Sequence, residues 1–475
     1  MSVGVALPAF LFEKGRLAPL VLFAIVGVGI LLPLGLVVVY ITRQAEYSVN
    51  RVLQMTSAGF FLQTEQKNSL STNKVVDILL TAQEFARLPI RRTDDEAMQR
   101  LAGELRNEVD SKDPKFTKMH PSVRKALLLI TAQTSRQSGS VPPEMREDFE
   151  TVVSLAPRLL EELLKLSQRG RAPVGYAWFR PFISILEYSQ CLTQAVPVSA
   201  LRSDKAGTSL EGLQSLLQLP HMDASLAKKL ARCKVRCLAD LLLLEAALRE
   251  EAVASLSLST PQRADFDAFL GAVPCISLRA SCATQGEDGD VLEGDLATCS
   301  VGVRLERLTA KHPPRTPFFS GDKEEGWWVL LADVASNTMF ASQRVSLHTK
   351  VGVTDAAAAA AASANSTLSN TQPAVGEQAV LLRFKAPPAG VHLLQVMVVS
   401  DYWIGCDRRV TLKLKVGKSA RQERAASAAA GTGAEGKGGG SSDDEAEGVT
   451  VEAADADVTE SGTSESEDGD ARGNN

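Results

Sequence analysis

The chain has 475 residues, which is long enough for two or three domains, and its hydrophobic content of 45% is ordinary for a globular protein. Its net charge is −5, but residues 441–475 hold 12 Asp and Glu against one Arg, so the first 440 residues carry +6. Neither part is basic enough to indicate a nucleic-acid-binding surface. The seven cysteines are odd in number and scattered, which favours reduced thiols in the cytosol over a disulfide framework.

Residues 17–42 are the first predicted element. They form a stretch of 26 residues without a charge, bounded by Arg16 and Arg43, and about 20 apolar residues suffice to cross a bilayer. A cleaved signal peptide usually has an apolar region of only about 7–15 residues. The glycines and prolines within the stretch are tolerated better in lipid than in a buried soluble helix. We therefore predict a transmembrane helix at 17–42, and the equal numbers of flanking cations leave its orientation open.

The next part, residues 43–209, has the apolar spacing of a helical domain. Thr93 and Glu96 have the spacing of a capping box at the start of one helix. A long amphipathic run occupies 152–166. A third helix is expected to begin near Pro181 and to end before Pro197, because proline is tolerated in a first turn and cannot continue a helix.

Residues 210–271 contain two short helical stretches, around Pro220 and Cys233, that resemble a helix-hairpin-helix. The cations Lys228, Lys229 and Arg232 could in principle contact nucleic-acid phosphates. On a protein tethered to a membrane, we interpret them instead as a solvated basic face.

After Gly271 the apolar period changes from that of helices to the alternation of half-buried strands. Seven strands are predicted, at 276–282, 297–305, 327–333, 339–347, 380–386, 391–400 and 410–416. Their number and their turn-rich connections indicate that residues 272–417 form a β-sandwich of the immunoglobulin or fibronectin type III kind. The Ala/Ser-rich stretch 355–371 is interpreted as an insertion loop, and residues 418–475 as a disordered acidic tail, because they cannot bury enough apolar area to offset the ordering entropy.

Two sites in the strand region carry specific expectations. Trp327 and Trp328 point to opposite faces of one strand, so one is expected in the core and the other exposed, where it could anchor a partner. The stretch 401–407 is expected to be a structural turn, in which Gly405 adopts a positive φ and the aspartates accept hydrogen bonds from nearby amides.

The sequence contains no recognisable enzyme site. Its five histidines lie in unrelated contexts, and neither a nucleophile–base pair, a phosphate-binding loop nor a paired-carboxylate arrangement is found. Cys233 and Cys237 lack the spacing and the further ligands of a zinc site. We therefore predict no catalytic residue, no metal and no cofactor.

The order of these features resembles the Sec63 family, the J-protein subunit of the endoplasmic-reticulum translocon, and most of all its plant and green-algal branch. The stretches that carry the resemblance are ALPAFLF (6–12), RRTDDE (91–96), HPSVRKALLLITAQTSR (120–136), LAPRLLEELL (155–164), YSQCLTQAVP (188–197), LLQLPH (216–221), WWVLLAD (327–333) and SDYWIGCD (400–407).

The resemblance implies a non-enzymatic helper of post-translational translocation, integral to the endoplasmic-reticulum membrane, with residues 1–16 lumenal and the folded mass cytosolic. The sandwich, through Trp327 or Trp328, would meet cytosolic loops of the channel and help to open it. The segment before the helix would meet the channel on the lumenal side by adding a β-strand, or would be a simple tether; its candidate residues are Ala6, Leu7, Pro8 and Phe10.

The resemblance also implies that the acidic tail recruits a second accessory subunit with a basic terminus, although such tails also serve as plain solubilisers. The acidic candidates are Asp443, Asp444, Glu445, Glu465, Glu467 and Asp468. Ser441, Ser442 and Ser464 each precede an acid by three residues, and phosphorylation there would strengthen the negative field.

Two departures qualify the resemblance. Family members have earlier transmembrane helices and a lumenal J domain with a His-Pro-Asp motif that stimulates the chaperone BiP, whereas here His120-Pro121 is followed by Ser122. We therefore expect recruitment of BiP only if a J domain is supplied elsewhere.

The alternative reading is a detached module of a Ski2-like RNA helicase, which carries a similar helical and sandwich unit but no spanning helix.

Overall fold

The computed structural model describes residues 23–24, 26–45, 47–48, 50–171, 175–199, 212–284, 291–308, 316–347, 349–351 and 377–418. The predicted lumenal contacts Ala6, Leu7, Pro8 and Phe10, the predicted insertion loop, and the predicted acidic and phosphorylation sites at 441–468 lie outside these residues.

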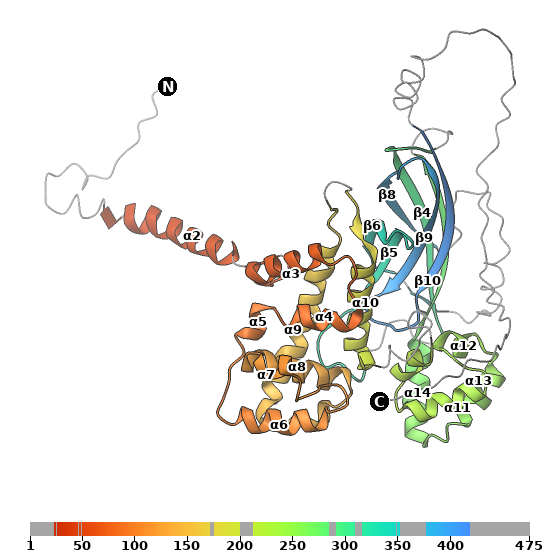
Figure 1. Cartoon of the computed structure of the whole chain (residues 1–475), viewed down its shortest axis with the longest axis horizontal. Coiled ribbons are helices and arrows are strands. Elements are labelled where there is room, and N and C mark those ends of the chain that lie inside the picture. The colour runs from red at the N-terminus through yellow and green to blue at the C-terminus, as the bar shows by residue number, and fades with distance from the viewer. Residues whose placement is uncertain are drawn as a thin grey trace, which may run out of the picture.

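A helical arm leads into the body of the molecule. A π-helical turn, η2 (Gly27–Leu31), continues into α2 (Leu32–Ala45), which projects away from the other elements (Figure 1). Large apolar side chains along it are exposed to solvent, for example Phe23 at 74% and Leu36 at 62%. Among the residues described, no helix combines the length and the apolar character that crossing a bilayer requires.

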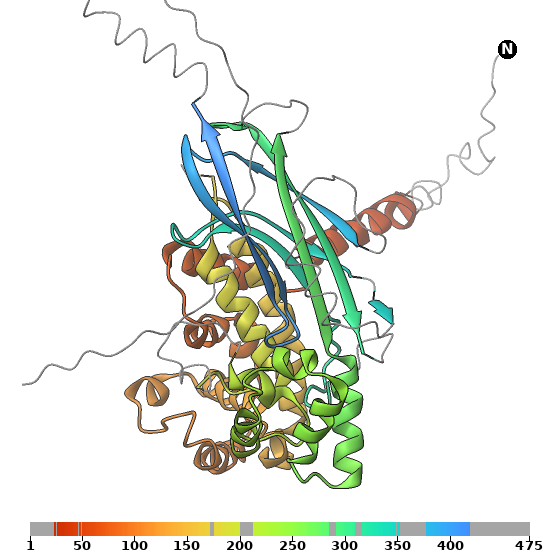
Figure 2. The same ribbon diagram turned by 90° about the vertical axis from the view of Figure 1, so that its right-hand side faces the viewer.

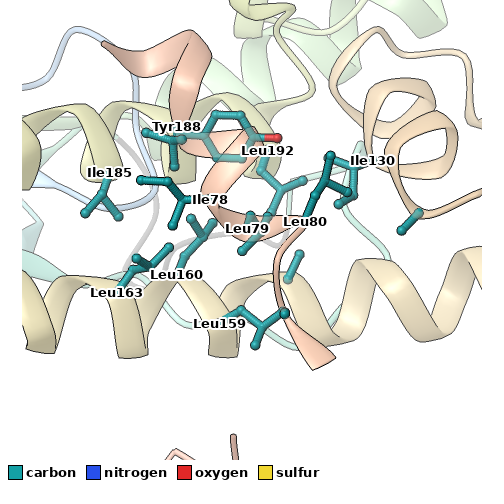
Figure 3. Close-up of a cluster of buried hydrophobic side chains, with 14 of the residues drawn as sticks. Ile78, Leu79, Leu80, Ile130, Leu159, Leu160, Leu163, Ile185, Tyr188 and Leu192 are labelled. Atoms are coloured by element: carbon teal, nitrogen blue, oxygen red, sulfur yellow. The ribbon is translucent and has the colours of Figure 1, made fainter. Parts of the chain in front are cut away.

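A bundle of helices follows the arm. It consists of α3 (Gln54–Gln66), α4 (Thr72–Leu79), α5 (Gln83–Ala86), α6 (Asp94–Glu104), α7 (Pro114–Lys118), α8 (Pro121–Thr134), α9 (Arg146–Ser167) and α10 (Phe179–Gln194), with 3-10 turns at Ser138–Ser140 and Pro143–Met145. The predicted run at 152–166 is confirmed as the larger, carboxy-terminal part of α9, and the helix beginning near Pro181 is confirmed as α10. Leucine and isoleucine side chains from α4, α8, α9 and α10 meet in the middle of the bundle, as Figure 3 shows.

The predicted capping box at Thr93 is wrong. Thr93 has helical dihedral angles, φ −79° and ψ −14°, and its side chain makes no capping hydrogen bond. The fully buried Asp94 instead accepts a hydrogen bond from the amide of Arg91 (2.9 Å) and one from the ammonium of the fully buried Lys125 (2.6 Å). Tertiary pairing of Asp94 with α8 therefore determines the local geometry.

These residues belong to a buried ionic cluster. The Lys125 ammonium also lies 2.5 Å from a carboxylate oxygen of Asp148 in α9, and the same oxygen lies 2.6 Å from the guanidinium of Arg91. Burial alone would raise the pKa of Asp94, but the hydrogen bonds from Arg91 and Lys125 outweigh it and lower that pKa. The cluster joins α6, α8 and α9 at one end of the bundle.

In the sequence, five short helices lie between the bundle and most of the strands. They are η6 (Leu213–Gln218), α11 (Ala224–Arg232), α12 (Leu238–Leu243), α13 (Ala246–Ala254) and α14 (Thr260–Ala272). The helical character predicted around Pro220 and Cys233 is confirmed. Capping explains several of the boundaries: Asp223 accepts hydrogen bonds from the amides of Ser225 and Leu226, and Ser259 forms a capping box with Gln262.

Two β-sheets complete the fold. Ten strands are described: β1 (Ala177–Trp178), β2 (Pro274–Thr284), β3 (Val291–Leu292), β4 (Leu296–Arg307), β5 (Trp327–Asp333), β6 (Thr338–Val345), β7 (Thr349–Val351), β8 (Gln378–Lys385), β9 (Gly390–Ser400) and β10 (Arg408–Gly417). The first sheet has the order β1-β6-β5-β9-β10-β3; in the second, β4 pairs with β2, β7 and β8. All seven predicted strands are present within a few residues of their predicted bounds.

The elements form three layers. The facing sides of the two sheets share one apolar core, which also includes residues of α11 to α14. The other side of the six-stranded sheet packs on the helical bundle, so this sheet is the middle layer (Figure 2). The strand β5 consequently has apolar residues on both sides, which is the pattern of a strand with no solvent face.

Replacing Lys125 with Met should destabilise the chain by about 3–5 kcal/mol, because the fully buried Asp94 would lose its cation and Asp148 would keep only the guanidinium of Arg91. Chemical denaturation of the full chain in detergent measures the loss. The matched control is Arg263→Met, which removes two ion pairs with the well-exposed Glu250 and Asp267 and should cost at most about 1 kcal/mol. Equal unfolding midpoints for the two variants would contradict the structural role of the cluster.

Candidate functional site

The tryptophan pair of β5 is buried on both sides, so the expectation of one exposed tryptophan is wrong. Trp327 is 1% exposed, lies in the core between the sheets, and donates its indole N–H to Glu325 (2.6 Å). Trp328 is 6% exposed and packs edge-to-face on Phe182 of α10, with ring centroids 5.2 Å apart. The physical reason is that the helical bundle covers the face that a free sandwich would leave in water. Both residues therefore serve packing and neither presents a surface to a partner.

The connection between β9 and β10 is a structural turn, as predicted, and most of it is buried. Gly405 has a φ of +74°, in the region that favours glycine. A carboxylate oxygen of Asp401 accepts a hydrogen bond from the amide of Gly326 (2.9 Å), and Asp407 accepts one from the amide of Ser400 (3.0 Å). Tyr402, like its neighbours in the loop, is buried. We call residues 400–407 the junction loop.

Glutamine side chains join the junction loop to the helices. In α10, Gln190 donates to the carbonyl of Ser400 (2.7 Å) and Gln194 donates to the carbonyl of Tyr402 (2.8 Å). Gln218 of η6 donates to the carbonyl of Ile404 (2.6 Å) and accepts from its amide (3.1 Å). All three glutamines are fully buried, where such hydrogen bonds are strong and expensive to lose.

Arg136, which follows the end of α8, binds backbone carbonyls beside the junction loop. Its guanidinium donates to the carbonyls of Ala195 (3.1 Å) and Gln194 (3.3 Å), and also bonds the carbonyl of Leu217. It stacks over the ring of Phe318, 3.8 Å from the ring centroid. Burial lowers the pKa of Arg136 to about 10, so the cation remains charged at neutral pH while it satisfies carbonyls at the ends of two helices.

A buried lysine completes this junction. The ammonium of Lys323 donates to the carbonyl of Asp401 and to the hydroxyls of Ser189 and Thr193 in α10. Burial lowers the pKa of Lys323, and the nearby carboxylate of Asp401 opposes that effect. The bundle, the short helices and the sandwich thus meet at one set of buried polar groups that are joined by hydrogen bonds.

The chemistry of the junction is structural. Its thiols, Cys191 and Cys406, are buried, and burial raises the pKa of both, so neither forms the thiolate that nucleophilic catalysis requires at neutral pH. Among the described residues, no group of three or more His, Cys, Asp or Glu is placed to hold a metal ion. The junction therefore fixes the relative positions of three parts of the chain.

One exposed surface stands out on the sheet beyond the reach of the bundle. Met397 of β9 packs on the bundle, but on the same face of that strand Val391 and Leu393 are 60% and 62% exposed. Their direct partners on β10 are Lys415 and Lys413, both exposed. We call these four residues the distal patch.

The edge of β9 beside the distal patch adds to its potential for docking. Within the described residues, β5 pairs with β9 only over 395–400, whereas β10 pairs with it over 390–398. A strand edge beside exposed apolar side chains is a common place for another chain to dock. Sequence reasoning missed this surface, because alternation alone does not reveal how far along β9 the bundle extends.

The junction glutamines were not predicted either. They lie within stretches that the resemblance singled out, YSQCLTQAVP and LLQLPH, but their partner is a loop about two hundred positions away in the sequence. The stretches that carry the resemblance cluster near 188–221 and at 400–407. This clustering is the one sequence feature that could have indicated a contact between the two regions.

Replacing Gln218 with Leu should cost about 1–3 kcal/mol for each backbone group of Ile404 left unpaired, because both are buried. Thermal unfolding of the full chain in detergent measures this as a lowered midpoint. Gln63→Leu is the matched control, since within the described residues the Gln63 amide donates to the hydroxyl of Thr81 near the surface. If the two variants unfold at the same temperature, the junction does not hold the fold together.

Comparison with known proteins shows which family has this architecture. A family model described as the Sec63 Brl domain matches residues 52–413, which include the bundle, the short helices, the junction and most of both sheets. The DnaJ protein ERDJ2A of Arabidopsis thaliana is 38% identical over 445 residues, covering 88% of this chain and 64% of that protein. DnaJ protein ERDJ2B of the same plant is 34% identical over 444 residues, covering 88% of this chain and 66% of that protein. The chain thus spans about two thirds of the length of these relatives.

RNA helicases share part of this similarity. The U5 small nuclear ribonucleoprotein 200 kDa helicase of Homo sapiens is 27% identical over 343 residues, which cover 72% of this chain but 13% of the helicase. The similarity to the helicases is thus weaker and confined to a small part of them. On the match of 52–413 and the identity to the two plant proteins, the chain belongs to the Sec63 family.

Proposed function

We propose that this protein is a non-enzymatic accessory subunit of the protein-translocation channel in the endoplasmic-reticulum membrane. The observation that carries the proposal is an apolar helical arm attached to a body with no enzyme site in its described residues. Membership of the Sec63 family and the similarity to two DnaJ proteins over 88% of the chain support it. The body would act by docking on the channel and favouring its open state.

The membrane anchor in this proposal is residues 17–42. The described part of this stretch carries large apolar side chains that are 38–74% exposed, an arrangement that costs free energy in water and none in lipid. Residues 17–22 and 25 lie outside the described part and would complete the span. The amino-terminal residues, including Ala6, Leu7, Pro8 and Phe10, would then be lumenal and contact the channel there, with the body in the cytosol.

The link from the anchor to the body is firm. Glu162 of α9 is 3% exposed and accepts hydrogen bonds from Asn50 (2.9 Å) and from Ser57 of α3 (2.9 Å). Glu84 accepts hydrogen bonds from the amide of Leu53 (2.8 Å) and the hydroxyl of Thr56 (2.6 Å). The segment that leaves the proposed anchor is thus held to the bundle on two sides, so the body would be positioned against the membrane rather than loosely tethered.

The distal patch is the surface that we propose for the cytosolic loops of the channel, in place of the buried tryptophans. It combines two exposed apolar side chains, two lysines and a strand edge, which suits an extended segment that carries both apolar and acidic residues. The acidic tail, with Asp443, Asp444, Glu445, Glu465, Glu467 and Asp468, would recruit a second accessory subunit through its basic terminus. Phosphorylation of Ser441, Ser442 or Ser464 would strengthen that contact.

The alternative function is a scaffold in RNA processing, which the similarity to the U5 helicases favours. The apolar stretch 17–42 argues against it, because a nuclear scaffold gains nothing from a spanning helix. The two functions predict different companions in a cell extract.

Substituting Arg for both Leu34 and Val38 should release the protein from membranes, since each cation at the centre of a span costs about 2.5–3.5 kcal/mol on insertion. Carbonate extraction of microsomes measures the fraction retained. Met55→Arg is the control, because Met55 is 74% exposed on α3 and lies outside the proposed span. Release of the unaltered protein from microsomes by carbonate would contradict the membrane anchor.

Substituting Glu for both Val391 and Leu393 should reduce recovery of channel subunits with the protein from detergent-solubilised microsomes at least about tenfold, the equivalent of 1.4 kcal/mol. Leu381→Glu is the control, because Leu381 is 54% exposed on the outer face of the other sheet. Unchanged recovery contradicts the distal patch as the docking surface. Recovery of RNA-processing factors without channel subunits favours the helicase alternative.

A further inference from the structure

A dense group of cations lies on the short helices at the base of the sandwich. Lys228, Lys229 and Arg232 lie on one side of α11, at the three- and four-residue spacing that places side chains together. Lys234 follows in a left-handed turn with a φ of +64°, and Arg236 comes two residues later. All five side chains are exposed, whereas the intervening Leu230 and Val235 are buried. We call these five cations the basic surface.

The acids nearest in sequence to the basic surface already have other partners. The carboxylate of Asp223 accepts hydrogen bonds from the amides of Ser225 (2.9 Å) and Leu226 (2.8 Å). Asp240 accepts hydrogen bonds from the amides of Arg236 (2.9 Å) and Cys237 (3.2 Å). These carboxylates cap helices, and each is a single charge against five. The basic surface therefore favours a partner with many negative charges.

The same chain contains such a partner. Residues 443–470 hold 12 Asp and Glu and no Lys or Arg. We propose that this acidic segment docks on the basic surface of its own chain. A second consequence rests on the proposed function: while docked, the segment is withheld from the basic accessory subunit, so the protein regulates its own assembly.

The connecting chain is long enough for this contact. The described residues end at Lys418, just beyond β10, and the acidic segment begins 25 residues later. A strand such as β2 rises about 3.3 Å per residue, so its 11 residues span about 36 Å between the two ends of the sandwich. Figure 2 shows the end of β10 at the opposite end of the sheet from α11–α14. A 25-residue connection extends to about 80 Å, which exceeds the length of the sandwich and the width of a helix together.

Attachment to the same chain gives the acidic segment an advantage over other polyanions. A covalent connection that spans the two sites provides an effective concentration of up to about a millimolar, far above that of most dissolved competitors. The contact is electrostatic and lies at the surface, so it is reversible and depends on salt. A nucleic acid is the competing ligand, and it would have to displace the segment first.

The first test is zero-length carbodiimide coupling of lysines to carboxylates in the full chain in detergent, with the products identified by mass spectrometry. An equal mixture of unlabelled and nitrogen-15 chains separates coupling within a chain from coupling between chains. Lys228, Lys229 and Lys234 should couple to residues 443–470 of the same chain several-fold more than the exposed control residues Lys112, Lys115 and Lys118. Coupling should fade at 1 M salt, where the Debye length is about 3 Å.

Equal coupling to the control lysines, or products that join two chains, would overturn the proposal.

The second test uses a fluorescent peptide of ten lysines as a stand-in for a basic partner. The variant with Lys228→Glu, Lys229→Glu and Lys234→Glu should bind it several-fold more tightly than the unaltered chain, because its acidic segment is free. The variant with Lys112→Glu, Lys115→Glu and Lys118→Glu should bind the peptide as the unaltered chain does.

Equal affinity of the two triple variants would also overturn the proposal. Removal of residues 419–475 should increase the affinity for single-stranded polyuridylate, and an unchanged affinity would show that nothing covers the basic surface. None of these measurements involves the channel or an accessory subunit. A failure here therefore leaves the proposed role in translocation untouched, and a failure of that role leaves the contact standing.

Discussion

The central constraint in this molecule is that strand β5 has no face in water. Trp327 projects into the core between the sheets and Trp328 into the core between the sheet and the bundle. Separating the bundle from the sandwich would expose one face of the six-stranded sheet, including Trp328 and Met397, together with the helices that cover it. The apolar area involved makes that separation costly. The two parts are therefore expected to behave as one body.

Polar groups add direction to this apolar contact. The junction glutamines, Arg136 and Lys323 reach backbone atoms of the junction loop and of the helix ends, and such bonds specify one alignment where apolar packing alone would tolerate several. At the other side of the bundle, Glu162 holds the start of α3. Contacts of α3 with α9, of α9 with α10 and of α10 with β9 thus connect the start of the bundle with the sheet. A body of this kind is suited to the docking role that we propose for it.

Much of the secondary structure could be predicted from the sequence, because local periodicity determines it. The alternation at 297–305 and 410–416 and the helical spacing at 152–166 are properties of the segments themselves. The errors arose where a distant segment decides the outcome. The spacing of Thr93 and Glu96 predicts a cap, but Thr93 makes no capping hydrogen bond. Lys125 of another helix donates to Asp94 instead. The run 327–332 is apolar without interruption, which is the pattern of a strand buried on both sides. Strand alternation alone predicts one exposed tryptophan, because it does not include the covering helix α10, which is far away in the sequence.

The candidate site was less predictable than the fold. Gln190, Gln194 and Gln218 are ordinary in sequence, and their importance comes entirely from burial against a loop about two hundred positions away. The distal patch depends on where the bundle stops covering β9, which no local pattern contains. By contrast, the turn at Gly405 was predictable, because the positive φ of this glycine and the hydrogen bond from the amide of Ser400 to Asp407 are local features.

Hydrogen exchange of the full chain in detergent tests the central claim most directly. If the bundle and the sandwich are one body, the slowest amides of α10 and of β9 exchange at the same rate, through a single global opening. Exchange of α10 well before β9, with the sandwich still protected, would contradict that claim, because the middle layer would then not be shared.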